Sequence, residues 1–182
     1  MEKILILTGD GGESYETLYA KHRFEEAGYQ SVIASPSVKL LNLVVHDFEP
    51  GWDTYVERKG YHLTSDIAIS DVDPEEYKAI LIIGGRAPEY LRNDPKVIEI
   101  VRHFDRPGKF VFSICHGIQV LVTAGLVEDR KLTCYEHVQF EVTSCGGSYI
   151  SESEAVRDGR IVTGQTWESH PDFYRLVFQC LE

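Results

Sequence analysis

The chain has 182 residues, 43% of them hydrophobic and 26% charged, which is enough to bury one substantial core and predicts a single domain over residues 1–182. Its formal net charge is -11, and the absence of a lysine and arginine cluster argues against a surface that neutralises phosphates or anionic lipids. We therefore expect neither a nucleic-acid partner nor a membrane partner.

The first apolar run and the cysteines bear on the compartment in which the protein works. Residues 3–8 form a short run with no basic region before it and no cleavage site after it, so it predicts a strand rather than a secretory signal. No stretch approaches the roughly 18 apolar residues of a membrane span. The four cysteines form no C-x-x-C pair, and a chain of this length does not need disulfide bonds, so a cytoplasmic location is expected.

Apolar runs of strand length recur along the chain, with helical patterns between them. Because these runs are apolar throughout rather than alternating, they favour parallel strands covered on both faces. Helices are predicted over residues 15–28, which end on a glycine, and over residues 94–104, where apolar residues recur at helical spacing after Asp-Pro. The order predicts a doubly wound α/β sheet. The predicted strands are residues 3–8, 31–35, 79–85, 109–115 and 160–164.

Two segments depart from this rhythm. Residues 36–70 are too long for an ordinary connection and alternate as a hairpin does, so they predict an inserted β element. Within residues 146–164, Asp158-Gly159 lies between two strand-like runs and predicts a second hairpin.

Three glycine-containing turns follow predicted strands. They are "GDGGES" after the first strand, "GGRAPEY" after residues 79–83 and "CHG" after residues 109–114. Ligands gather outside the carboxyl ends of parallel strands, so the three turns are expected to meet at one edge of the sheet. Cys115, His116, Glu13 and Glu89 are the candidates for this edge.

Cys115 is the candidate nucleophile. A sharp turn would expose its sulfur, the amides of the following helix would lower its pKa, and Gly117 permits the close approach that such a turn requires. The alternative is a small buried residue at the end of an apolar run. Adjacent residues point in different directions, so a direct proton transfer to His116 is uncertain and a second base is expected.

The two candidate glutamates also have an alternative interpretation as solvated or helix-capping carboxylates. If Glu13 lies near a thiolate, the two groups should share one proton, because adjacent negative charges repel. Histidines and cysteines lack metal-ligand spacing, and "GDGGES" lacks the spacing of a dinucleotide-binding turn. We therefore expect no metal and no cofactor.

At these residues the chain resembles the ThiJ/PfpI superfamily, which contains the Parkinsonism-associated deglycase and the PfpI-type intracellular proteases. The similarity covers nearly the whole chain and is carried by "SICHG", by "GGRAPEYL" and by Glu13 before the 15–28 helix. Residues 45–48, 58–77 and 168–176 resemble one half of the tandem-domain plant members described as glyoxalase III enzymes.

The resemblance implies a flavodoxin-like three-layer sandwich, related to class I glutamine amidotransferases, with helices on both faces of a mostly parallel sheet and a β insertion around residues 36–70. It implies a nucleophile-elbow Cys115 with His116 as its partner and with Glu13 hydrogen-bonded to the sulfur. It also implies that Glu89 approaches a neighbouring subunit in a homo-oligomer. Many members have proline where this chain has Ile118, so the helix start is expected to differ.

Further residues are expected to belong to the substrate site or the interface. They are Gly84, Gly85 and Gly117 in the strand-end turns, and His170, whose "HPD" resembles the His-Pro-Glu of the amidotransferases. We favour His170 as a residue at a helix N-terminus.

The expected function is a cofactor-independent glyoxalase III or deglycase activity on methylglyoxal, glyoxal or their early glycation adducts. Cys115 would add to the aldehyde to give a hemithioacetal, a base would move the proton from C1 toward C2 through an enediol, and water would release the hydroxy acid. The base is His116 or the Glu13 carboxyl, and we favour Glu13 because adjacency places His116 poorly. Two alternatives stay open: a cysteine hydrolase of the peptidase or amidotransferase type, and a non-enzymatic redox sensor or stress chaperone that uses Cys115 oxidation.

Overall fold

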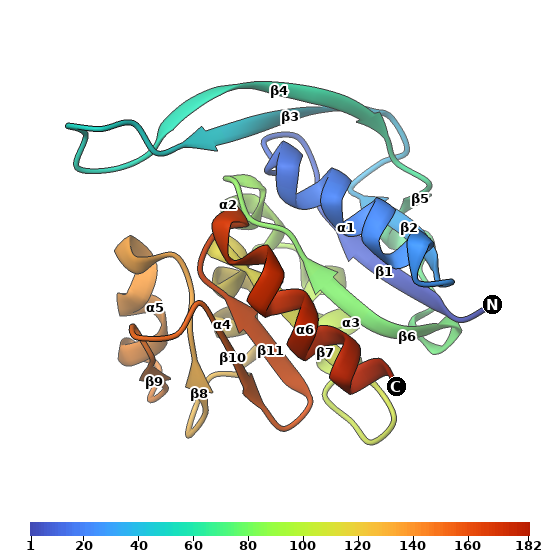
Figure 1. The fold of residues 1–182 in the computed structure, drawn as a ribbon. Coiled ribbons are helices and arrows are strands. Elements are labelled where there is room, and N and C mark those ends of the chain that lie inside the picture. The colour runs from blue at the N-terminus through green and yellow to red at the C-terminus, as the bar shows by residue number, and fades with distance from the viewer.

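A seven-stranded sheet forms the centre of the computed structural model, which describes all 182 residues (Figure 1). The strands are β1 (Lys3–Leu7), β2 (Gln30–Ser35), β5 (Ile67–Ala68), β6 (Tyr77–Ile82), β7 (Phe110–Ile114), β10 (Ala155–Asp158) and β11 (Ile161–Gly164). Their order is β10-β11-β7-β6-β1-β2-β5, and every neighbouring pair is parallel except β10 and β11. The predicted parallel sheet and the hairpin at Asp158-Gly159 are both confirmed.

Helices cover both faces of this sheet and create two cores. In Figure 1, α1 (Ser14–Glu26) and α6 (His170–Leu181) lie side by side on one face. Their buried residues join a core that includes the inward side chains of β1 and β6. On the other face, α2 (Ala87–Leu91), α3 (Pro95–His103) and α4 (Ile118–Ala124) pack on the opposite side chains of the same strands. The uninterrupted apolar runs therefore reflect strands buried on both sides.

Local signals set the helix boundaries close to where the sequence predicts them. The Asp94 side chain accepts a hydrogen bond from the Lys96 amide and Pro95 occupies the first turn, so α3 begins one residue after the predicted start. Helix α1 ends at Glu26, and Gly28 follows with a φ of 88°. Beyond β8 (Lys131–Leu132), a short helix α5 (Gln139–Ser144) leads to β9 (Ser148–Tyr149), which pairs with β8 outside the central sheet.

The inserted β element is a long antiparallel hairpin of β3 (Leu40–Asp47) and β4 (Val56–Thr64). It lies across the top of the molecule in Figure 1, over the β1–α1 turn. Backbone hydrogen bonds fix it there: the Gly11 amide donates to the Asn42 carbonyl at 2.8 Å, and the Val44 amide donates to the Gly12 carbonyl at 2.9 Å. The hairpin thus contributes residues to the carboxyl edge of the central sheet without joining that sheet, whereas β5, at the end of the predicted insertion, pairs with β2 as the edge strand of the sheet.

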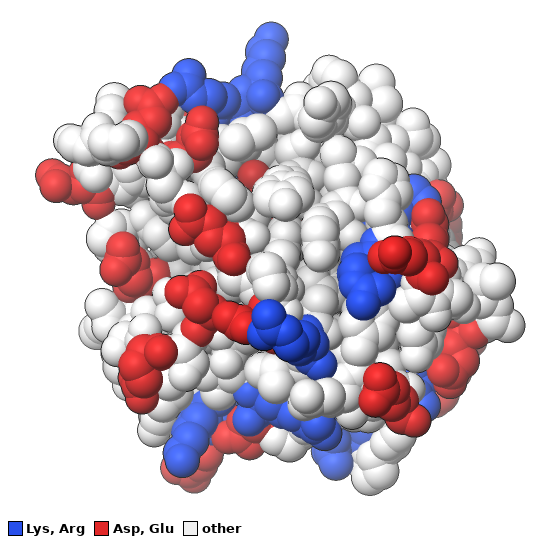
Figure 2. All heavy atoms as spheres, viewed as in Figure 1, with Lys and Arg blue, Asp and Glu red and all other residues white.

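The charge of the surface and the length of the helices bear on the expectation of no nucleic-acid and no membrane partner. Acidic side chains are spread over the face seen in Figure 2, and the basic side chains there are interspersed with them. This distribution agrees with the net charge of -11. No helix has the length and apolar character that a membrane crossing requires.

Gly117 should be a position where even one methyl group is not tolerated. A Cβ there would lie 2.7 Å from both the Ile82 carbonyl oxygen and the Ser113 hydroxyl oxygen, so backbone must move to make room. We expect Gly117→Ala to lower the free energy of unfolding by about 1–3 kcal/mol, the usual range for overpacking. Urea denaturation measures this loss, with the exposed His22→Gln as the control. Equal stability of the two variants would contradict the predicted crowding.

Candidate active site

Three turns converge at the carboxyl edge of the sheet, as the sequence predicts. The turn after β1 and the turn after β6 form a bridge between Gly12 and Gly85, and the Arg86 amide donates to the Gly11 carbonyl at 2.9 Å. Gly85 has a φ of 72°, and a Cβ there would lie 2.3 Å from the Gly11 carbonyl oxygen. Only glycine therefore allows the two turns to approach this closely.

Cys115 occupies the sharp turn that follows β7. Its φ of 57° lies in the left-handed region, which is unfavourable for a residue with a side chain by roughly 1–2 kcal/mol. The residue is 3% exposed, and a Cβ on Gly84 would lie 2.7 Å from its own Cβ. The structure thus confirms the predicted turn and shows a strained thiol held between two strand ends.

Glu16 is the carboxyl group that lies against the Cys115 thiol. Its Oε2 accepts a hydrogen bond from the Gly84 amide at 2.7 Å, while its Oε1 is buried without a nitrogen or oxygen partner. Burial raises the pKa of Glu16 well above its ordinary value, the charge of Glu13 raises it further, and hydrogen bonds from Gly84 and Cys115 oppose the shift. Sequence reasoning missed Glu16, although it lies three residues after Glu13, in the first turn of the helix that Glu13 caps.

Glu13 is buried at the N-terminus of α1 and has a capping geometry. Its Oε2 accepts from the Glu16 amide at 2.7 Å, and its Oε1 accepts from the His46 amide at 3.4 Å. Burial raises its pKa to about 7. The structure therefore directs the Glu13 carboxylate to backbone amides and brings Glu16 to the sulfur, whereas the resemblance implied a Glu13–sulfur hydrogen bond. A catalytic role for Glu13 stays a prediction.

Burial also governs the ionisation of the sulfur. It raises the pKa of the Cys115 thiol, and the neighbouring Glu16 charge raises it further, while the His116 amide opposes the shift. The lowered pKa expected from the helix amides alone is thus outweighed by desolvation. Because each negative charge disfavours the other, Cys115 can ionise only while Glu16 keeps its proton.

His116 lies beside the thiol despite being its neighbour in the chain. Its Nδ1 is 3.3 Å from the Cys115 Sγ. Burial lowers the pKa of His116 to about 4, so the ring is neutral at neutral pH and can accept a proton. Nδ1 is therefore placed to exchange a proton with the sulfur, which adjacency alone left uncertain.

Aromatic side chains close the site on the side of the hairpin. The ring centroid of His116 lies 5.5 Å from that of Tyr55 and 5.2 Å from that of Tyr135. The Tyr135 hydroxyl is 3.4 Å from the hydroxyl of Thr54, a residue between β3 and β4, which links these aromatic side chains to the hairpin. Sequence reasoning missed these residues, because no motif in residues 36–70 shows which strand-end turns the hairpin will contact.

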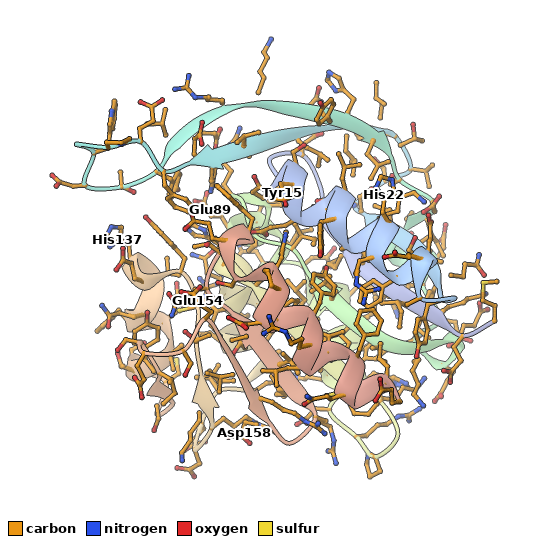
Figure 3. The ribbon with its side chains drawn as sticks, in the orientation of Figure 1. Tyr15, His22, Glu89, His137, Glu154 and Asp158 are labelled. Carbon is orange, nitrogen blue, oxygen red and sulfur yellow. The ribbon has the colours of Figure 1, made fainter.

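Glu89 and His170 occupy different surroundings. Glu89 is exposed on α2, and its charge raises the pKa of both His46 and Tyr55, so it lies near the site of its own chain (Figure 3). Its approach to a second subunit stays a prediction. His170 begins α6, as favoured, and its ring stacks on Tyr19 with 4.5 Å between centroids. No group of three or more His, Cys, Asp or Glu side chains is arranged to hold a metal ion.

Comparisons with known proteins bear on the family and the fold of the chain. The model of the DJ-1/PfpI family matches residues 2–179. The chain is 36% identical to protein DJ-1 homolog D of Arabidopsis thaliana over 98% of its own length, but it spans only 47% of that relative. It is also 36% identical to a deglycase of Thermococcus kodakarensis, over 94% of this chain and 93% of the relative.

A solved structure shows the same fold. A two-domain protein from Anabaena variabilis, with DJ-1/ThiJ/PfpI-like and ferritin-like domains, superposes with a TM-score of 0.86 and 22% identity. The match covers 100% of this chain and 48% of that protein. The flavodoxin-like prediction is therefore confirmed.

His170→Phe should make the protein more resistant to acid. Both ring nitrogens of His170 are buried without partners, and burial lowers its pKa to about 4. An unfolded histidine has a pKa near 6.5, so the unfolded state binds more protons and stability falls as the pH drops from about 6.5 to about 4. At pH 5 we expect phenylalanine to remove a penalty of about 2 kcal/mol, measured by urea denaturation at pH 5 and 7.5. A pH dependence identical to that of the wild type would contradict this account.

Proposed function

Because the chain belongs to the DJ-1/PfpI family, we propose that it is a deglycase that acts on small reactive carbonyl compounds and converts free methylglyoxal or glyoxal to the hydroxy acid, as a glyoxalase III does. The observation that carries the proposal is the strained Cys115 thiol held between the Glu16 carboxyl and the His116 imidazole. The name of the Thermococcus relative supports the deglycase class.

The reaction begins when the sulfur adds to the aldehyde. The thiol proton passes to His116 Nδ1, which lies 3.3 Å away, and the thiolate forms a bond to the aldehyde carbon C1. The C1–O π electrons move to oxygen, which takes the Glu16 proton. The product of this step is a neutral hemithioacetal, and Glu16 is left as a carboxylate.

An internal proton transfer then completes the redox change. The Glu16 carboxylate removes the proton from C1 while the protonated His116 gives its proton to the C2 oxygen, which gives the enediol. Glu16 returns its proton to C2 and takes the C1 hydroxyl proton as the C1=O bond forms, so that Glu16 is again protonated and His116 is again neutral. C1 is thereby oxidised to the level of an acid, and the C2 ketone is reduced to an alcohol. Water hydrolyses the resulting thioester, which releases the hydroxy acid and the Cys115 thiol. No external oxidant or reductant enters this balance.

Early glycation adducts enter the same sequence. A hemithioacetal or hemiaminal formed from methylglyoxal releases the free aldehyde reversibly, so removal of the aldehyde by Cys115 reverses the adduct. The same groups would therefore serve both the glyoxalase and the deglycase activity.

Cys115→Ser should abolish the activity. We expect wild-type protein to convert methylglyoxal to lactate without added thiol or metal, and the serine variant to lose turnover because its hydroxyl stays protonated. Lactate formation measures this, and Cys145→Ser, at an exposed free cysteine, is the matched control. Release of ammonia from glutamine or cleavage of a peptide, in place of lactate formation, would favour the hydrolase alternative.

The two buried glutamates should differ in their effect on turnover. Glu16→Gln keeps the shape of the side chain but removes the titrating proton, so we expect a loss of roughly 10²–10⁴-fold in kcat, the usual scale of general acid–base catalysis. Glu13→Gln, which keeps one side-chain oxygen to accept the capping hydrogen bond from the Glu16 amide, should lose far less. Steady-state kinetics of the pair decides between them. A large loss in Glu13→Gln with near-normal Glu16→Gln would make Glu13 the proton carrier.

A further inference from the structure

His46 is a second buried histidine at this site, and the proposed reaction does not yet use it. It comes from β3 of the hairpin, and its side chain is 1% exposed. Its ring stacks on Tyr55 with 3.8 Å between centroids and meets His116 edge-on at 5.7 Å. The hairpin thus brings an imidazole to the neighbourhood of Cys115.

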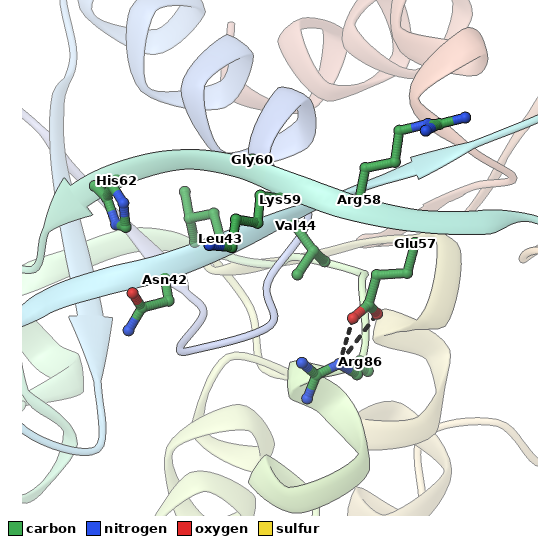
Figure 4. Close-up of a pocket in the computed structure, with 9 residues that line it drawn as sticks. All are labelled: Asn42, Leu43, Val44, Glu57, Arg58, Lys59, Gly60, His62 and Arg86. Carbon is green, nitrogen blue, oxygen red and sulfur yellow. Dashed lines mark hydrogen bonds and ion pairs between the residues drawn. The ribbon is translucent and has the colours of Figure 1, made fainter.

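A carboxylate fixes the tautomer of this ring. His46 Nε2 lies 3.1 Å from a Glu57 oxygen, and Glu57 accepts from the Arg86 Nε at 2.9 and 3.0 Å (Figure 4). The hydrogen bonds from Arg86 and His46 hold the pKa of Glu57 below its ordinary value against its partial burial, so Glu57 is ionised and can only accept. Nε2 must therefore carry the proton, which leaves Nδ1 of the neutral ring as a bare acceptor.

Nδ1 of His46 is the atom without a partner. It is buried and makes no hydrogen bond. A buried acceptor left unpaired is unfavourable, and the Glu57–Arg86 pair is what maintains this arrangement. An orientated, unprotonated nitrogen on a ring that meets His116, the residue beside the Cys115 thiol, is the arrangement of a general base.

We propose that His46, orientated by Glu57 and Arg86, is the general base that activates the water which releases the acid from Cys115. The inference rests on the proposed function for the identity of the acid, but any thioester on Cys115 would need the same step. His46 Nδ1 takes a proton from water, the water oxygen forms a bond to C1, and the C1–S bond breaks with its electron pair going to sulfur. The proton on His46 then returns to solvent or to the product.

The charges around His46 keep it ready for this role. Burial lowers its pKa, whereas the hydrogen bond and the charge of Glu57 raise it. The ring is therefore neutral at neutral pH and becomes protonated, and inactive as a base, on the acid side. The titratable or charged groups that face it are Glu57, Tyr55, Arg86, Glu89 and His116.

The test separates acylation of Cys115 from its deacylation. p-Nitrophenyl acetate acylates a reactive thiol, and intact mass spectrometry then follows the loss of the acetyl group. We expect His46→Gln to form the acetyl-thioester at the wild-type rate and to hydrolyse it roughly 10²-fold more slowly or worse. Glu57→Gln should move the acid limb of the deacylation pH profile to lower pH, because its charge no longer raises the pKa of His46. His22→Gln, at an exposed histidine, is the matched control.

Three results would overturn the proposal. The first is unchanged deacylation in His46→Gln. The second is an equal fall of acylation and deacylation, which would give His46 only a structural role. The third is a ¹⁵N NMR spectrum that places the neutral-ring proton of His46 on Nδ1, a readout that needs no turnover. If wild-type protein fails to convert methylglyoxal while deacylation still depends on His46, the proposed function fails and this inference stands.

Discussion

The burial of Glu16 against Cys115 is the constraint on which the rest of the site depends. Two acidic groups occupy one desolvated space, where the charge of either one disfavours ionisation of the other, so Cys115 can ionise only while Glu16 keeps its proton. Placing them there requires a left-handed residue at the end of β7 and a strand-end turn with no side chain at Gly84. The glycines and the strained turn are therefore consequences of bringing a carboxyl to a thiol.

The central sheet with its helices and the β3–β4 hairpin contribute different groups to the site. The central sheet supplies the nucleophile at the end of β7, and the helix α1 that covers the sheet supplies its carboxyl partner in its first turn. The β3–β4 hairpin supplies His46, Tyr55 and the Glu57 that links to Arg86. The hydrogen bonds from the hairpin to Gly11 and Gly12 keep the two contributions in register.

The elements that local patterns determine were predictable from the sequence. Uninterrupted apolar runs gave the parallel strands, Asp-Pro gave the start of α3, and "CHG" after a strand gave the turn at Cys115. Which of Glu13 and Glu16 lies against the sulfur could not be predicted, because it depends on the residue at which α1 begins. Glu13 caps the helix and Glu16 lies in its first turn. His46 was missed because its place is set by contacts between the hairpin and residues more than thirty positions away.

The pKa of Cys115 also could not be predicted from the sequence, because it depends on how deeply the fold buries the sulfur. A helix N-terminus lowers the pKa of a thiol, and the sequence reveals that helix. The depth at which the sulfur is buried is a property of the whole fold, and here desolvation is the larger effect.

The aromatic cover over Cys115 has a consequence for the size of what can react there. Cys115 is 3% exposed, and its charge raises the pKa of both Tyr55 and Tyr135, so the two rings lie close to the thiol, with 5.7 Å between their centroids. A carbonyl carbon attached to a protein or a nucleotide is therefore hindered from reaching the sulfur. A free two- or three-carbon aldehyde needs only a small opening between the two rings. Under the proposed function, adducts would therefore be consumed mainly through the aldehyde that they release, and repair would proceed at the rate of that spontaneous release.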